Sequence, residues 1–313
     1  MSLTVCAIVA AFSCSAESLA PASPAPPQPP PQTAGRTDPC GGAQELLKKY
    51  LSASPCVFIL GEASVQATYA GTNVPIVLSY TAHGHTAEVT QSSRAFGYPG
   101  ALLNIGVTPS SQVTVVLPSF SQANSSQTGA REAGADDMEF RYKQLLYSNR
   151  KRGVLAGILV TYQAPTGSSA QAAPGPSYEL NPLLNLALNQ TRTIGENLSF
   201  PVTNALASQP NGSQKRSWSF APQAVTFWRS PGGTLLALVV QYGFATNITY
   251  LTINTAQLLS RSFQLQATYG GNNFPVDFVN PIEDVGRATG KGYSRSFTIG
   301  FSYLVGRSEL PPR

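Results

Sequence analysis

Charged side chains are scarce in this chain. Lys, Arg, Asp and Glu make up 11% of its 313 residues, against roughly 25% in an ordinary soluble domain. Beyond the N-terminus the chain also lacks the run of about 18 apolar residues that a helical membrane span needs. The net charge of +5 is scattered, whereas nucleic-acid binding needs a concentrated basic patch. Together with many Gly, Ser, Thr, Asn and Gln residues, these absences favour an outer-membrane barrel over a cytosolic enzyme or a nucleic-acid-binding protein.

Histidine is limited to His83 and His85, in a segment that we predict to be a loop. Two histidines spaced by two residues on an extended chain can offer metal ligands, but such a pair is more often polar surface, so we predict no metal site. A barrel hydrolase needs a nucleophile beside a histidine near the membrane rim, whereas both histidines of this chain lie in a predicted loop. The chain also has no Gly-x-Ser-x-Gly elbow and no phosphate loop after a strand. We therefore predict no enzyme activity, no catalytic residue and no cofactor.

The N-terminal region reads as an exported leader followed by a linker. In residues 1–20 an apolar stretch precedes small residues, with candidate cleavage sites after Ala16 and Ala20, as in a secretory signal. Residues 21–39 are Pro-rich, a composition that cannot pack a core and forms an extended linker.

Few cysteines remain once the signal is removed. Cys40 and Cys56 then stand alone, on either side of a predicted short helix, and residues 40–56 form a periplasmic segment. Two cysteines in an oxidising compartment are expected to pair, with two free thiols as the alternative. In the chain-entropy model such a cross-link contributes about 3 kcal/mol to stability.

The most informative stretch lies near the C-terminus, at residues 293–305. Side chains alternate between the two faces of a strand, and here one face is apolar while the other is small and polar. The two sets are Phe297, Ile299, Phe301, Tyr303 and Val305 against Ser296, Thr298, Gly300 and Ser302.

The same alternation recurs in twelve segments. They cover residues 57–70, 98–108, 111–119, 136–147, 153–163, 177–189, 192–203, 216–229, 233–244, 248–257, 262–270 and 292–305. The apolar face is too extensive for a small core, which favours a closed barrel with lipid outside and water inside. The sequence therefore predicts an all-β, antiparallel, twelve-stranded transmembrane barrel over 57–305, followed by a tail at 306–313.

The connections between these segments alternate in length. Tight turns such as Pro109-Ser110 and Pro231-Gly232 alternate with longer links rich in Gly, Ser and Asn. Outer-membrane barrels have short periplasmic turns and long external loops. We expect the two longest links, 71–97 and 271–291, to act as lids.

Aromatic residues suggest where the membrane boundaries lie. Trp218 and Trp228 share a face and are ten residues apart, which corresponds to roughly 25 Å along the membrane normal at 3.3 Å per residue and a tilt near 40°. This equals the separation of the two aromatic girdles of such barrels. The predicted girdle comprises Tyr69, Tyr162, Tyr178, Trp218, Trp228, Tyr269 and Tyr303.

Charged residues cluster on the predicted inner face. An acidic pair followed by a basic pair occupies alternate positions of one strand, and two glutamates of other strands face the same lumen. The predicted pore-lining residues are Glu62, Asp137, Glu139, Arg141, Lys143 and Glu179. They could form a charged ring that focuses the field across a pore, or salt bridges that simply fill the lumen.

Several short motifs resemble a known barrel family. Val160-Thr161-Tyr162-Gln163-Ala164-Pro165-Thr166-Gly167, followed by Tyr178-Glu179-Leu180-Asn181-Pro182, is similar to a strand end and the next strand of that family. Cys40-Gly41-Gly42, Ser54-Pro55-Cys56 and Gln266-Ala267-Thr268-Tyr269-Gly270 are further similar pieces. The family comprises outer-membrane proteins associated with the meta-cleavage pathway of phenol degradation. The resemblance implies a barrel that moves small, often aromatic, compounds across the bacterial outer membrane, and it supplies no catalytic residues.

The sequence thus predicts passive passage of a small solute through a narrow or gated barrel. Its predicted partners are the lipid bilayer of the outer membrane and the solute, without nucleic acid. One alternative is a structural or binding barrel that conducts nothing, because charge pairs and the 41–52 helix block its lumen. Another is a secreted, soluble all-β binding module.

Overall fold

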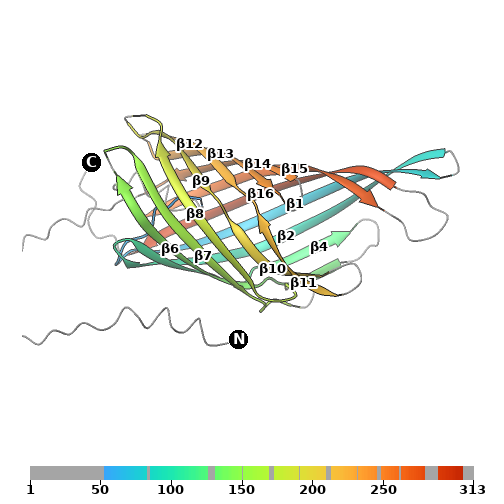
Figure 1. The fold of residues 1–313 in the computed structure, drawn as a ribbon, viewed down its shortest axis with the longest axis horizontal. Coiled ribbons are helices and arrows are strands. Elements are labelled where there is room, and N and C mark those ends of the chain that lie inside the picture. Colours follow the sequence, from blue (N-terminus) through green and yellow to red (C-terminus); the bar gives the residue numbers. More distant parts are fainter. Residues whose placement is uncertain are drawn as a thin grey trace, which may run out of the picture. The chain divides into compact units, whose positions relative to one another are not determined.

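The computed structural model describes residues 53–82, 85–125, 131–149, 151–168, 173–189, 191–208, 213–230, 232–244, 248–260, 262–278 and 288–305. Within them the fold is all-β and antiparallel (Figure 1). The strands are β1 (Ala63–Ala82), β2 (His85–Thr108), β3 (Ser111–Val116), β4 (Phe120–Ser125), β5 (Arg131–Ala135), β6 (Met138–Asn149), β7 (Val154–Ala164), β8 (Ser177–Ala187), β9 (Ile194–Ser199), β10 (Val202–Ser208), β11 (Gln214–Phe220), β12 (Gln223–Arg229), β13 (Thr234–Gly243), β14 (Ile248–Leu258), β15 (Phe263–Phe278) and β16 (Ala288–Val305).

The sheet closes on itself because β1 pairs with both β16 and β2. Consecutive strands pair in an antiparallel ladder, and the sixteen strands form a barrel of twelve. Four barrel strands are each interrupted once, which gives the pairs β3/β4, β5/β6, β9/β10 and β11/β12. Pro118, Pro201 and Pro222 lie at three of these interruptions, because proline cannot donate to a ladder. The prediction of a twelve-stranded antiparallel barrel is confirmed.

The predicted alternation of faces is also confirmed. In β13, the outward side chains Leu236, Leu238 and Val240 are 40–47% exposed, whereas Leu235 and Ala237 are at most 2% exposed. An apolar face of this extent, open on the outside of a closed barrel, matches hydrocarbon rather than water. No helix among the described residues is long and apolar enough to cross a membrane.

The structure corrects the start of the first strand and the extent of two predicted loops. The first strand begins at Ala63, not at residue 57, because the chain before it turns away from the wall. The links 71–97 and 271–291 are not long loops: β1 and β2 pair as far as Ala82 and His85, and β15 and β16 pair as far as Phe278 and Ala288. These four strands extend beyond the ends of the other strands of the barrel (Figure 1). The expectation that loops at these positions act as lids is therefore not met. The predicted signal, linker, 41–52 helix and 306–313 tail lie outside the described residues.

Candidate functional site

The segment before the first strand lies inside the barrel. Each residue from Ala53 to Phe58 is at most 2% exposed. These residues contact inward-facing side chains of the wall, close to the rim that carries the short turns. We call residues 53–58 the inserted segment.

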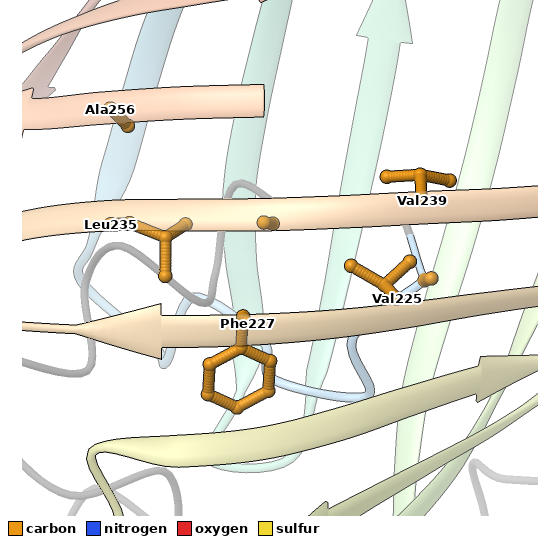
Figure 2. Close-up of a cluster of buried hydrophobic side chains, with 7 residues drawn as sticks. Val225, Phe227, Leu235, Val239 and Ala256 are labelled. Atoms are coloured by element: carbon orange, nitrogen blue, oxygen red, sulfur yellow. The ribbon is translucent and has the colours of Figure 1, made fainter. Parts of the chain in front are cut away.

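One end of the inserted segment covers an apolar patch of the lumen. Ala53 packs with buried side chains of β12, β13 and β14. Figure 2 shows how these strands present them side by side: Val225 and Phe227 from one strand, Leu235 and Val239 from the next, and Ala256 from the third. Strand β13 is apolar on both faces, so it needs lipid on one side and a protein cover on the other.

The other end of the inserted segment reaches the opposite wall. Cys56 and Val57 pack with Leu145 of β6 and Leu155 of β7. In the strand order, β8 and β9 lie between β7 and β12 in one direction, and β15, β16, β1, β2 and β3 lie between β14 and β6 in the other. The inserted segment therefore crosses the lumen from wall to wall and obstructs it near the short-turn rim.

Two buried side chains of the wall bond to the backbone of the inserted segment. The N–H of Phe58 donates to Gln112 Oε1 at 3.0 Å, and Lys143 Nζ donates to the carbonyl oxygen of Cys56 at 3.4 Å. Gln112 Nε2 in turn donates to Asn104 Oδ1 at 3.2 Å. The polar wall of β2 and β3 is thus part of a continuous network with the inserted segment, and a buried network of this kind fixes one arrangement when its members are satisfied.

A tight turn leads the chain from the lumen into the wall. Gly61 has a φ of +87°, which glycine adopts readily. Glu62 is 4% exposed, and its side-chain Oε2 accepts a bond from the N–H of Ile59 at 3.1 Å. The N–H of Leu60 donates to the carbonyl oxygen of Thr108 at 3.1 Å. Glu62 therefore shapes the turn that begins β1.

Glu139 and Arg141 of β6 pair with each other. Arg141 Nε and Nη2 donate to Glu139 Oε1 and Oε2 at 2.5 and 3.1 Å, a bidentate arrangement that is among the stronger ion pairs. Glu179 of β8 accepts a bond from Thr203 Oγ1 at 3.3 Å. Glu139–Arg141 is thus one ion pair on the inner face, and the filling of the lumen by charge pairs stays a prediction.

Asp137 accepts hydrogen bonds from a loop and is not exposed to water in the lumen. It is 7% exposed and accepts bonds from the N–H groups of Gly167 and Ala173, both at 2.8 Å, and from Gln163 Nε2 at 3.2 Å. The loop after β7 is therefore held to the start of β6. All six residues predicted to line the pore form hydrogen bonds within the protein, and their role in conduction stays a prediction.

The seven predicted girdle residues are exposed. Their exposed fractions run from 38% for Tyr69 and Tyr162 to 72% for Trp218. Tyr162 and Tyr178 are neighbours, with ring centroids 5.4 Å apart. Their position against the membrane boundaries remains a prediction. His85 begins β2, and His83 lies outside the described residues.

The inserted segment is the feature that sequence reasoning missed. Its residues were assigned to the first strand or to a periplasmic segment, because Val57 to Leu60 are apolar and continue directly into β1. A signal was available in β13, where apolar side chains occupy both faces. A membrane strand with an apolar inner face indicates that something covers it inside the barrel.

A closed antiparallel barrel with an apolar, exposed outer face defines an outer-membrane β-barrel protein. No protein family and no curated protein matches this chain by sequence. Among solved structures it is similar to the COG4313 outer membrane channel from Pseudomonas putida F1, with 14% identity, a TM-score of 0.54, and coverage of 79% of this chain and 97% of that one. Likeness at this identity establishes the fold alone.

Two other solved barrels are similar at a lower level. The NanC porin has 10% identity and a TM-score of 0.42, and the match covers 77% of this chain and 98% of the porin chain. The Ralstonia pickettii toluene transporter TbuX has 8% identity and a TM-score of 0.42, with 79% and 90% covered. At these scores we draw no argument from either.

Proposed function

We propose that this protein is a gated outer-membrane channel for the passive passage of small solutes. The observation that carries the proposal is the inserted segment, which crosses the lumen and bonds to Lys143 and Gln112 of the wall. Such a segment can leave without breaking the ladder that closes the barrel, because the inter-strand bonds start at β1. The barrel is then the conduit and the inserted segment its gate.

Aromatic or apolar solutes are the class that we propose. The apolar patch under Ala53 would be uncovered when the inserted segment moves, and Phe227 and Leu235 would then line the path. The sequence resemblance to the phenol-degradation family favours the same solutes. We take the short turns to be periplasmic, so the inserted segment would close the periplasmic end.

The wall residue Lys143 offers a test of the gate. Replacing it by methionine, Lys143→Met, keeps the shape but removes the donor to the Cys56 carbonyl. An unsatisfied buried carbonyl costs about 1–3 kcal/mol, so the open state should become roughly tenfold more populated. Single-channel conductance in planar bilayers measures this, with brief openings expected for the unaltered protein.

The matched control is Lys215→Met, which removes the same charge from an exposed position of β11. It should leave the open probability unchanged. Absence of any current from both the unaltered protein and Lys143→Met would contradict the channel proposal. That outcome would support the alternative of a non-conducting barrel, which the paired charges of β6 favour.

A disulfide between Cys40 and Cys56 would tether the gate. Cys56 is fully buried in the inserted segment, and Cys40 lies outside the described residues, so the pairing is a proposal. In the unfolded, unreduced chain Cys56 should resist a thiol-alkylating reagent, and it should be labelled after reduction. Labelling of Cys56 without reduction, mapped by peptide mass spectrometry, would rule out the tether.

A further inference from the structure

The outer face of the barrel carries a row of alternating arginine and asparagine. The backbone registers place Arg295 of β16 opposite Asn73 of β1, and Asn73 opposite Arg94 of β2. The row continues to Asn124 of β4, which lies opposite Arg94. Figure 1 shows β16, β1 and β2 as neighbours in the wall. We call these four residues the arginine row.

The arginine row faces outward. Asn73 shares a face of β1 with Val65 and Tyr69, and Arg295 shares a face of β16 with Phe297, all of which are exposed. The side chains of Asn73, Arg94, Asn124 and Arg295 are themselves exposed. The arginine row therefore belongs to the outer surface and not to the lumen.

An aromatic row lies directly below the arginine row, toward the short-turn rim. Phe96 and Phe297 flank Gly71, two residues before Asn73 in β1. A Cβ at Gly71 would collide with the ring of Phe297, so the glycine lets the ring lie flat on the outer wall. Tyr69 packs near the same ring, with centroids 6.1 Å apart. Aromatic residues of this kind mark the boundary between hydrocarbon and headgroups.

The depth of the arginine row agrees with this boundary. Ala63 pairs with Val305 at the short-turn end, and Asn73 pairs with Arg295 ten residues along. Ten residues at 3.3 Å and a tilt near 40° span roughly 25 Å, which is the height of the apolar band. Arg295 thus lies where the hydrocarbon ends, on the side of the long connections.

From this arrangement we propose that Arg94 and Arg295 bind phosphate groups of lipids in the outer leaflet. The two arginines lie two strands apart, about 10 Å at the usual strand spacing, with Asn73 between them as a further donor. Guanidinium groups bind phosphate in a bidentate manner, and no acidic residue lies in the register between them. The positive charge of Arg94 and Arg295 is complementary to the phosphorylated headgroup of the membrane lipid, which is the ligand that we propose. This proposal does not depend on transport.

The test uses the full-length, folded protein in detergent and a titration with diphosphoryl lipid A. The double variant Arg94→Gln with Arg295→Gln should bind about 25-fold more weakly, roughly fivefold for each arginine. The single variants should each show the smaller loss, so the proposal stays testable if the double variant folds poorly. Folding is checked by heat-modifiable migration on a gel.

The matched control removes two charges from the opposite rim, with Lys151→Gln and Arg152→Gln in an exposed turn. It should retain the affinity of the unaltered protein. Lipid A without its phosphates should bind all variants equally weakly, and excess inorganic phosphate should not displace the lipid. Unchanged affinity in the arginine variants, or an equal loss in the control, would overturn the proposal.

Discussion

Replacing Gly106 by alanine should open the barrel. A Cβ at this inward position of β2 would lie 2.7 Å from the carbonyl oxygen of Phe58, and closer still to that of Ile59. The wall is held by ladders on both sides, since Gly106 pairs with Gln112 of β3 and its neighbours pair with β1. The chain that begins at Phe58 and enters the turn is the part that can move. Overpacking of this kind costs about 1–3 kcal/mol, so the population of the closed state relative to the open state should fall roughly 5- to 150-fold.

The measurement is single-channel conductance, together with proteolysis of the region around Phe58. The matched control is Gly100→Ala, on the same strand and far from the inserted segment. There the nearest atom to an added Cβ is Thr68 Oγ1, at 3.3 Å, and no atom of the inserted segment lies nearby. The proposed gate would be wrong if Gly106→Ala folded normally and conducted no more than Gly100→Ala.

The barrel was predictable because its signal is local. In a membrane strand every second residue contacts lipid. The outward orientation of residues such as Ile299 and Phe301 can therefore be predicted from the few residues around them, and both are exposed. The placement of the charged residues followed from the same alternation, and Lys143 and Glu62 do lie on the buried side. The strand extensions were missed because above the membrane the alternation no longer separates lipid from water.

The inserted segment was not predictable in this way. Its bonds join residues that are 54 and 87 positions apart, Phe58 to Gln112 and Lys143 to Cys56. A lone apolar stretch before a strand reads as part of that strand, and nothing local tells a buried lumen segment from a membrane-facing one. The polar partners carry no pattern either, since Gln112 and Lys143 resemble ordinary lumen side chains, and the apolar inner face of β13 indicates a cover without identifying it.

Because lipid covers the outer face, the cost of a charge placed there should depend on its depth in the membrane. Val240 of β13 is 40% exposed and pairs with Ala224, which lies four residues from Trp228 and six from Trp218. Val240→Arg therefore puts a charge near the middle of the apolar band, where it should cost about 2–4 kcal/mol. Leu236 pairs with Trp228 near the boundary, so Leu236→Arg should cost at most about 1 kcal/mol.

These two variants share the strand, the face and the introduced side chain; they differ in depth and in the aliphatic side chain that is removed, valine or leucine. Urea titration of folding into lipid vesicles, followed by the gel shift of the folded barrel, compares their stabilities. A soluble sandwich, in which both positions meet water, predicts two small and equal effects. A protein whose outer face packs against another protein predicts losses that follow the contacts of each site. A loss of stability that is larger at Val240, far from Trp228, than at Leu236, beside it, is expected only when this face is in contact with hydrocarbon.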